Sequence, residues 1–306
     1  MKILLTGSSG MVGQNIINHK KFKKYTFLIP SSSELNLLEE RNVESFLKSN
    51  NPDLIIHAAG FVGGIQSNIN SPVDFLLKNS LMGINLINKS KELKIKSFLN
   101  LGSSCMYPAN IATKISESML LSGPLEPTNE GYAISKILST KLCEFISKSF
   151  PEFNYKTIIP CNLFGKYDKF DPIKSHLIPA AIMKIHNAKI YDKSVEIWGN
   201  GDARREFMYA EDFSNLIFYA IENFSEMPHV MNVGMGIDYT INDYYIAIAN
   251  EIGFNGKFIH DLSKPEGMKR KIVDNFKLSK FGWKPSFSLN EGIKETYSYY
   301  LETLNG

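Results

Sequence analysis

The sequence is poor in cysteine, in excess charge of one sign and in long apolar runs. Its 3 cysteines are too few and too widely spaced for a disulfide scaffold or a CxxC metal site. Its 34 Lys and Arg nearly balance 31 Asp and Glu, so the net charge of +3 lacks the basic excess of nucleic-acid-binding proteins. No apolar run approaches the ~18 residues that span a membrane. We therefore expect a soluble, cytoplasmic protein that binds neither nucleic acid nor membranes and has no metal site.

The first half of the chain alternates short apolar segments with segments of helix length. The expected strands are Lys2–Leu5, Tyr25–Ile29, Leu54–His57, Ser97–Leu101 and Tyr155–Ile159. The expected helices between them are Met11–Asn18, Glu39–Ser49, Pro72–Leu93 and Glu130–Phe150. Apolar strands that alternate with helices are typical of a parallel sheet covered on both faces. The sequence therefore predicts an α/β fold with a doubly wound parallel sheet of the Rossmann type.

The second half has more loops, which separate shorter elements expected at Leu177–His186, Asp212–Glu222 and Ile241–Ile252. At 306 residues, the chain is about twice the ~150 residues usual for one domain. We divide it into a dinucleotide-binding domain, residues 1–165, and a smaller, irregular α/β substrate-binding part, residues 166–306. Some elements of the second part are expected to return to the sheet.

A glycine-rich loop lies between the first expected strand and the first expected helix. It reads TGSSGMVG over Thr6–Gly13, a GxxGxxG pattern. Gly7 permits a tight turn, Gly10 lets the backbone approach a pyrophosphate, and Gly13 lets the helix pack closely on the strand. The backbone N–H groups at the start of the helix then face the anion. This loop predicts a dinucleotide-binding site.

The segment after the second expected strand usually selects between NAD and NADP. An acidic residue there binds the ribose 2′-hydroxyl, whereas a basic residue favours the 2′-phosphate. Here the segment reads PSSSE over Pro30–Glu34. Its serine hydroxyls could bind a phosphate, Glu34 could bind a hydroxyl, or the turn could have no discriminating role. The choice stays open at this point.

Three further residues indicate carbonyl chemistry. Tyr132 and Lys136 are four residues apart on an expected helix, so their side chains leave the same face. A lysine ammonium beside a phenol lowers the phenol pKa, which would let the tyrosine exchange a proton with a carbonyl oxygen. Ser103 follows the strand that ends at Leu101, at the sheet edge where ligands bind. A glycine loop, a strand-end serine and YxxxK, in this order, predict a short-chain oxidoreductase core.

Two nearby residues could add acid/base chemistry. Cys105 lies two residues after Ser103, and His176 precedes an expected helix. Taken alone, Cys105 is consistent with a small buried hydrophobic residue, and His176 with a surface or capping residue.

Together these segments resemble the GDP-L-fucose synthase family of extended short-chain dehydrogenases. The matching stretches follow one another along the chain at Gly10–Gly13, Glu34–Leu38, Val62–Ile65, Leu101–Pro108, Leu125–Glu130, Tyr132–Lys136, Asn162–Leu163, Ser175–Pro179, Trp198–Gly199, Arg205–Phe207, Lys264–Pro265 and Gly282–Trp283. A series of this length in a fixed order is more specific than any single motif.

The resemblance implies a reductase triad of Ser103, Tyr132 and Lys136, with Cys105 and His176 as the acid/base pair of a 3,5-epimerase. The implied substrate is a GDP-4-keto-6-deoxy sugar, mannose or a related heptose. Its C4 ketone acidifies the C3 and C5 protons, so acid/base groups on opposite ring faces can invert those centres. NADPH would then deliver hydride to C4 while Tyr132 gives its proton to the C4 oxygen.

The binding residues also follow from the matching positions. Those expected at the cofactor are Gly7, Ser9, Gly10, Met11, Val12, Gly13, Ser32, Asn36, Leu37, Ala58, Ala59, Leu101, Gly102, Tyr132, Lys136, Pro160, Asn162, Leu163 and His176. Those expected at the substrate are Ser104, Cys105, Asn162, Lys184, Trp198, Arg205 and Lys271. Lys184 and Lys271 are the implied charge partners of its phosphates. The structural alternatives are a core position for Trp198 and a solvated surface position for Arg205.

Some positions depart from the family. Arginines that the family commonly has in the glycine loop and after the second strand are Ser9 and Ser32 here, and Lys184 stands where an arginine is frequent. The two serines weaken an NADPH preference without reversing it, because no aspartate replaces the arginines. We expect NADPH as the preferred cofactor, with NADH not excluded.

Other functions stay open beside this one. The enzyme could reduce without epimerising, or could be a nucleotide-sugar 4-epimerase. A 4,6-dehydratase is less favoured, because Ser104 and Cys105 stand where that group has an Asp-Glu pair. A non-catalytic dinucleotide sensor would not need both Tyr132 and Lys136. The two long expected helices, Pro72–Leu93 and Glu130–Phe150, resemble the pair that forms a four-helix dimer interface in this superfamily, so we expect a homodimer.

Overall fold

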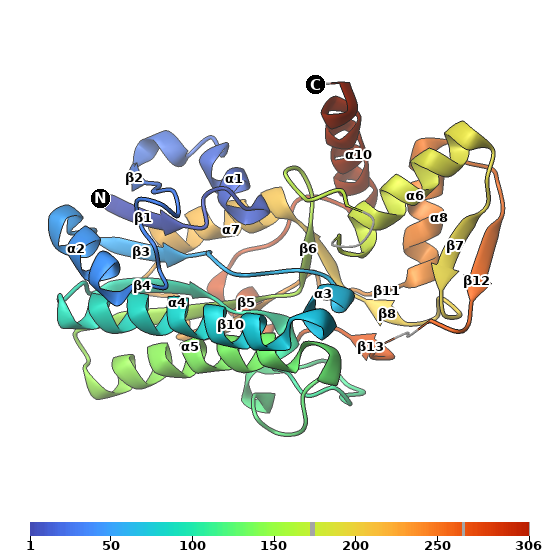
Figure 1. Ribbon diagram of the computed structural model, residues 1–306. Helices are drawn as coiled ribbons and strands as arrows, with labels where there is room; N and C mark the ends of the chain where they lie inside the picture. Colours follow the sequence, from blue (N-terminus) through green and yellow to red (C-terminus); the bar gives the residue numbers. More distant parts are fainter. Residues whose placement is uncertain (172–174, 265–266, 306) are drawn as a thin grey trace.

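A parallel sheet of six strands forms the centre of the protein (Figure 1). The structure is a computed structural model that describes residues 1–171, 175–264 and 267–305. The sheet strands are β1 (Lys2–Thr6), β2 (Thr26–Leu28), β3 (Leu54–His57), β4 (Ser97–Leu101), β5 (Asn154–Pro160) and β10 (Val230–Val233). Their order is β10-β5-β4-β3-β1-β2, and every pairing is parallel. The predicted Rossmann-type α/β fold is confirmed.

Helices cover both faces of this sheet (Figure 1). One face carries α1 (Met11–Ile17) and α7 (Ala210–Glu222), and the other carries α2 (Glu40–Asn50), α4 (Pro72–Glu92) and α5 (Glu130–Ser149). Because side chains alternate along a strand, β1 sends Ile3 and Leu5 into the core with α7, and Leu4 into the core with α4 and α5. Burial on both faces explains why these strands are almost continuously apolar.

A second core lies beside the sheet, at the right of Figure 1. It is enclosed by α6 (Leu177–Tyr191), α8 (Ile241–Ile252), α10 (Leu289–Asn305) and the parallel pair β7 (Val195–Trp198) and β12 (Phe258–Asp261). Helix α6 is longer than predicted, because it continues past His186 until Asp192 adopts a left-handed φ of 51°. Residues beyond 165 therefore build this core and also supply α7 and β10 to the main sheet. The domain boundary at residue 165 stays a prediction.

Two small sheets connect the main sheet to the second core. Strand β6 (Asn162–Phe164) pairs with β9 (Phe207–Tyr209). Strand β8 (Arg204–Arg205) lies between β11 (Tyr239–Thr240) and β13 (Arg270–Lys271). The remaining α-helices of the described chain are α3 (Ile65–Asn70) and α9 (Phe276–Phe281).

All three cysteines are unpaired. Within the described ranges, no helix is long and apolar enough to cross a membrane. The same ranges hold no cluster of three or more His, Cys, Asp or Glu side chains arranged to hold a metal ion.

Candidate active site

The glycine loop follows β1, where the strand order of the sheet reverses, with β2 on one side and β3 on the other. Ligands of such sheets bind at the carboxyl ends of the strands at this point. Gly7 has a left-handed φ of 72°, and a Cβ on Gly13 would lie 2.3 Å from Gly7 O. At Gly10 the nearest atom to an added Cβ is 3.5 Å away. The fold itself therefore needs glycine at 7 and 13, and the open space at Gly10 fits a dinucleotide pyrophosphate.

The other residues expected at the cofactor lie around the same edge of the sheet. Ala58 and Ala59 follow β3, and their backbones are within 2.7 Å of a Cβ built on Gly7. The remaining positions are Leu101 at the end of β4, Gly102 after it, Pro160 at the end of β5, and Asn162 and Leu163 in β6. Asn36 and Leu37 follow the exposed serine turn that carries Ser32. The strand ends thus bring distant segments of the chain to one edge, although their roles stay predictions.

In the turn after β2, the side chain of Glu34 is bound by a serine of the same turn. Glu34 Oε2 accepts hydrogen bonds from Ser31 N and Ser31 Oγ, each at 2.8 Å. These bonds hold the pKa of Glu34 below its usual range. The carboxylate therefore stabilises its own turn here, and the exposed serines remain on the surface of that turn.

The three residues expected as the reductase triad lie together. Tyr132 and Lys136 come from α5, and the side chain of Ser103, just after β4, hydrogen-bonds Tyr132. Lys136 Nζ lies 5.8 Å from the centre of the Tyr132 ring and donates to Leu101 O at 2.9 Å. The helix and the strand end thus present a phenol, a hydroxyl and an ammonium to one site.

The prediction that Lys136 lowers the pKa of Tyr132 is wrong for this structure. Burial of the phenol raises its pKa, Cys105 raises it further, and the Ser103 hydrogen bond only partly offsets them. The reason is geometric, because the Lys136 ammonium is bound to a backbone carbonyl rather than to the phenol oxygen. Tyr132 consequently keeps its proton at neutral pH, the state that a proton donor needs.

Lys136→Met is expected to stabilise the protein at pH 7. Burial lowers the pKa of Lys136 from 10.5 to about 8, and each unit costs ~1.4 kcal/mol while the lysine is charged. The substitution removes this cost but leaves Leu101 O without its donor, a loss of about 1 kcal/mol. The expected net gain is ~1–2 kcal/mol in the free energy of unfolding measured with urea.

The gain from Lys136→Met should shrink between pH 8 and pH 10. In that window the unfolded chain binds more protons than the folded one, so the wild-type stability rises with pH. Lys148→Met on the exposed end of the same helix is the control, with a change of less than about 1 kcal/mol. A loss of stability at pH 7 for Lys136→Met would contradict the burial cost.

Cys105 lies beside the triad with two donors on its sulfur. Lys271 Nζ and Asn129 Nδ2 each lie 3.4 Å from Cys105 Sγ, and Cys105 N donates to Ser103 Oγ at 3.2 Å. The residue is half-buried, so the interpretation of Cys105 as only a buried hydrophobic residue does not describe it. Ser104 beside it is 3% exposed, which places that expected substrate contact inside the wall of the site.

His176 immediately precedes α6 and its side chain does not cap the helix. The residue remains exposed to solvent, although the protein packed around its ring and the nearby Lys271 ammonium both lower its pKa. The two residues expected as the acid/base pair, Cys105 and His176, therefore lie close to the same lysine. Asn129 was missed by the sequence reasoning, although the matching stretch Leu125–Glu130 contains it.

Two of the residues expected at the substrate, Trp198 on β7 and Arg205 on β8, differ in their exposure to solvent. Trp198 is 43% exposed, which excludes a core position for its ring. Arg205 is partly buried and donates to Met268 O at 2.5 Å, and burial lowers its pKa, so it is not a freely solvated surface residue. Asn162 Nδ2 donates to Glu206 O at 3.0 Å, next to Arg205.

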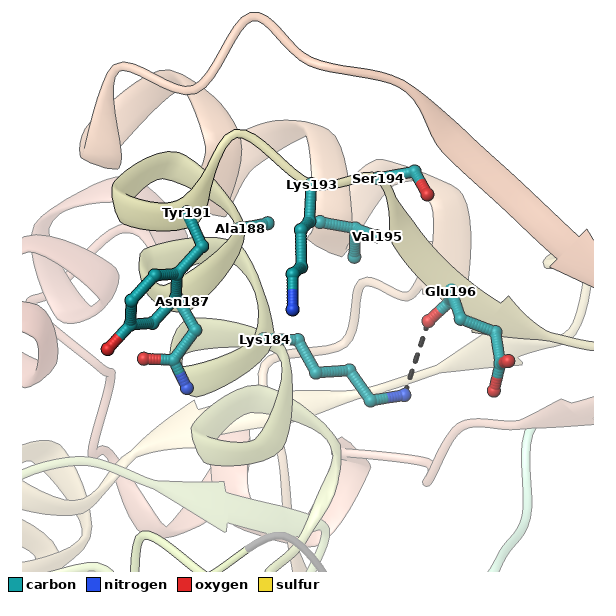
Figure 2. A pocket seen from close by; sticks show the side chains of 8 residues that line it. All are labelled: Lys184, Asn187, Ala188, Tyr191, Lys193, Ser194, Val195 and Glu196. Carbon is teal, nitrogen blue, oxygen red and sulfur yellow. Dashed lines mark hydrogen bonds between the residues drawn. The ribbon is translucent and has the colours of Figure 1, made fainter.

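A groove of about 540 Å³ lies between α6 and β7, lined in part by Lys184, Tyr191 and Lys193. Figure 2 shows the Lys184 side chain reaching toward β7, where its Nζ donates to Glu196 O at 3.2 Å. The same ammonium lies 5.6 Å from the centre of the Trp198 ring. A smaller cavity of about 240 Å³ borders Tyr132 and Asn129 instead. The lysine is thus close to the exposed indole rather than to the triad.

Comparison with known proteins identifies the family. Residues 3–234 match the NAD dependent epimerase/dehydratase family. The chain is 56% identical to GDP-L-colitose synthase of Yersinia pseudotuberculosis over 100% of its length and 99% of that protein. It is 46% identical to GDP-L-fucose synthase of Azorhizobium caulinodans, covering 98% of this chain and 96% of the relative. The chain belongs to the GDP-L-fucose synthase group of this family. The predicted resemblance is confirmed.

A solved structure of a similar protein has the same fold as this chain. The GDP-mannoheptose C4 reductase from Campylobacter jejuni with NADP bound superposes with a TM-score of 0.87 at 27% identity, over 98% of each chain. Within the GDP-L-fucose synthase group, the present chain is thus an oxidoreductase of the short-chain dehydrogenase type.

Proposed function

We propose that the protein is a cytoplasmic enzyme that uses NADPH to reduce the C4 ketone of a GDP-4-keto-6-deoxy sugar after epimerising C3 and C5. The observation that carries the proposal is the meeting of Ser103, Tyr132 and Lys136 with Cys105, whose sulfur contacts Lys271. One site then holds both a proton donor for a C4 oxygen and an acid/base group for ring carbons. The names of the relatives, two GDP-sugar synthases and a GDP-sugar C4 reductase, support the same substrate class.

Each residue has a defined task in this proposal. NADPH held at the glycine loop would supply the hydride for C4. The Tyr132 hydroxyl gives its proton to the C4 oxygen, and the Ser103 hydroxyl hydrogen-bonds the same oxygen. Lys136 compensates the charge that develops on the tyrosine oxygen. Cys105 and His176 remove and return protons at C3 and C5, which the ketone acidifies.

The preference for NADPH over NADH rests on the serine turn. Glu34 is engaged by Ser31, so the carboxylate that would recognise a 2′-hydroxyl is directed into its own turn. The hydroxyl of Ser32 can accept or donate a hydrogen bond at a 2′-phosphate. The NADP-bound relative supports this choice. We propose that NADPH is preferred by a modest factor, because no arginine is present to bind the phosphate bidentately.

NADPH oxidation with a panel of sugars tests the function. We expect turnover with GDP-4-keto-6-deoxymannose or with the 4-keto precursor of GDP-L-colitose, and the 56% identity to GDP-L-colitose synthase makes the latter the second candidate substrate. A GDP-4-keto heptose and UDP-glucose complete the panel. Sugar interconversion without net use of NADPH would indicate a 4-epimerase. A protein that oxidises NADPH with none of the GDP-4-keto sugars would overturn the proposal.

We also propose a homodimer formed by α4 and α5 of two copies. These helices pack closely on each other, since a Cβ on Gly83 would lie 2.2 Å from Ser139 Oγ. Apolar side chains remain exposed on their outer faces, among them Leu77, Ile134, Leu138 and Phe145. A second copy would cover this surface and form a four-helix bundle.

Phe145→Glu is expected to convert the dimer to a monomer, because Phe145 is 60% exposed and a buried carboxylate without a partner is strongly disfavoured at an interface. Light scattering at micromolar concentration measures the mass. Phe276→Glu is the matched control, since Phe276 is 63% exposed on α9 and the variant should remain dimeric. A monomeric wild-type protein would refute the dimer.

A further inference from the structure

Four cations occupy two neighbouring short strands close to the proposed sugar-nucleotide site. Strand β13 runs parallel to β8 with Arg270 opposite Arg204 and Lys271 opposite Arg205. Strands in a sheet lie ~4.8 Å apart and successive side chains point to opposite faces. Like charges directly opposite each other destabilise a strand pair. An anion is therefore needed for this register to be stable.

Asp238 supplies that anion on one face of the small sheet. It is 4% exposed and lies immediately before β11. Arg270 Nε and Nη2 donate to its two carboxylate oxygens at 2.6 and 3.2 Å. Arg204 Nη2 donates to Asp238 O at 2.6 Å and to Asp238 Oδ1 at 3.3 Å. The Asp238 carboxylate thus binds both arginines and links β8, β11 and β13. We call this group of Asp238, Arg204 and Arg270 the Asp238 clamp.

The opposite face of the sheet carries the cations of the proposed site. Lys271 is 9% exposed, and its ammonium contacts Cys105 Sγ at 3.4 Å. Arg205 precedes Glu206, a residue 1% exposed whose carboxylate accepts from Gly236 N at 2.6 Å and from Val273 N at 2.9 Å. Glu206 therefore binds backbone N–H groups that lie outside β11 and β13. Within the small sheet, the side chain that links the strands is Asp238.

We propose that Asp238 is a positioning residue for the sugar-nucleotide site. By holding Arg204 and Arg270 together on the reverse face, it fixes β13 against β8 and so places Lys271 beside Cys105 and next to Arg205. This inference rests on the proposed function, because it takes Arg205 and Lys271 as the cations that meet the diphosphate. Asp238 itself does not touch the reacting atoms, and acts through the two strands.

Asp238→Asn tests the clamp. Asparagine keeps the volume but loses the charge, so the two guanidinium groups repel each other and Lys271 shifts. We expect the KM for the nucleotide sugar to rise about tenfold, the size of one lost charge-assisted hydrogen bond. The kcat at saturation should stay within about threefold, because the triad lies on other elements. The Kd of NADPH, measured by fluorescence, should be unchanged.

Two further variants separate positioning from simple folding effects. Arg270→Gln removes one of the two arginines bound to Asp238 and leaves Arg204 paired with the carboxylate. It should raise the KM for the nucleotide sugar about as much as Asp238→Asn does. It carries the test if Asp238→Asn does not fold. Asp238→Glu restores the charge and should recover part of the affinity. Asp274→Asn is the matched control, because Asp274 accepts a hydrogen bond from Phe276 N at 2.7 Å near the same strand. Within the part of the chain that the structure describes, Asp274 forms no ion pair with Arg204 or Arg270.

Binding of GDP, measured by calorimetry, distinguishes failure of the proposed function from failure of the proposed role of Asp238. A wild-type protein that binds GDP but oxidises no NADPH refutes the proposed function, while a tenfold weaker Kd in Asp238→Asn still supports the clamp. If Asp238→Asn and Arg270→Gln keep the wild-type KM and the wild-type Kd for GDP, the clamp is wrong, even if both variants unfold more easily. That last pattern would make Asp238 a purely structural residue.

Discussion

Tyr132→Phe is expected to lower kcat by about 10³-fold, because the variant lacks the only proton that the phenol could give to the C4 oxygen. General acid catalysis by a positioned side chain contributes roughly 10²–10⁴-fold. The structure supports a neutral donor, since burial raises the pKa of Tyr132. The ring still fills its place on α5, so the Kd of NADPH should change by less than about twofold.

The control for this variant is Tyr191→Phe. Tyr191 is 66% exposed and lines the groove beside α6, so the loss of its hydroxyl should leave kcat unchanged. If Tyr132→Phe retained wild-type turnover, Tyr132 would not be the donor. If it retained a regulatory effect on a partner while the wild type showed no turnover, the protein would be a dinucleotide sensor rather than an enzyme.

Cys105→Ser is expected to slow solvent exchange at C3 and C5 by about 10²–10³-fold, the contribution of one acid/base group. A serine hydroxyl is a far weaker acid than a thiol, and it cannot accept and return these protons at a useful rate. Reduction of a 4-keto sugar that already has the product configuration should continue, because Ser103, Tyr132 and Lys136 are untouched. The exchange is followed by NMR in deuterated water, and the reduction by NADPH oxidation.

Cys143→Ser controls for the general effect of replacing sulfur by oxygen. Cys143 is fully buried between α5 and the sheet, so the change should lower stability without slowing exchange. Equal exchange in Cys105→Ser and the wild type would remove Cys105 from the mechanism. Absence of exchange in the wild type itself would leave a reductase without epimerase activity.

The features that could be predicted from the sequence are those set by short-range patterns. The strands β3 and β4 lie at the predicted residues, and the element expected at Ile241–Ile252 is the helix α8. Apolar runs with flanking polar segments mark the ends of all three. The glycine loop follows directly from β1, and the four-residue spacing of Tyr132 and Lys136 fixes their common helix face. These local signals place the two halves of the proposed reductase site at the same edge of the sheet.

The features that could not be predicted depend on contacts between distant segments. Lys271 and Cys105 are 166 residues apart, and no spacing rule relates them. Asp238 joins Arg204 and Arg270 from 34 and 32 residues away. The direction of the Tyr132 pKa was also predicted wrongly, because it depends on how far the fold buries the phenol and on which acceptor Lys136 finds. The burial of a side chain and the identity of its hydrogen-bond partner are set by tertiary packing, which a local sequence pattern does not show.

The most direct test of the central claim is one reaction in deuterated water, with NADPH and GDP-4-keto-6-deoxymannose, followed by NMR of the GDP-sugar product. The account predicts one product per NADPH oxidised, with deuterium from solvent at C3 and C5 and protium from NADPH at C4. That labelling requires one enzyme to perform both the proton transfers and the reduction. A product reduced at C4 without deuterium would contradict the coupled epimerisation, and unconsumed NADPH would contradict the reductase itself.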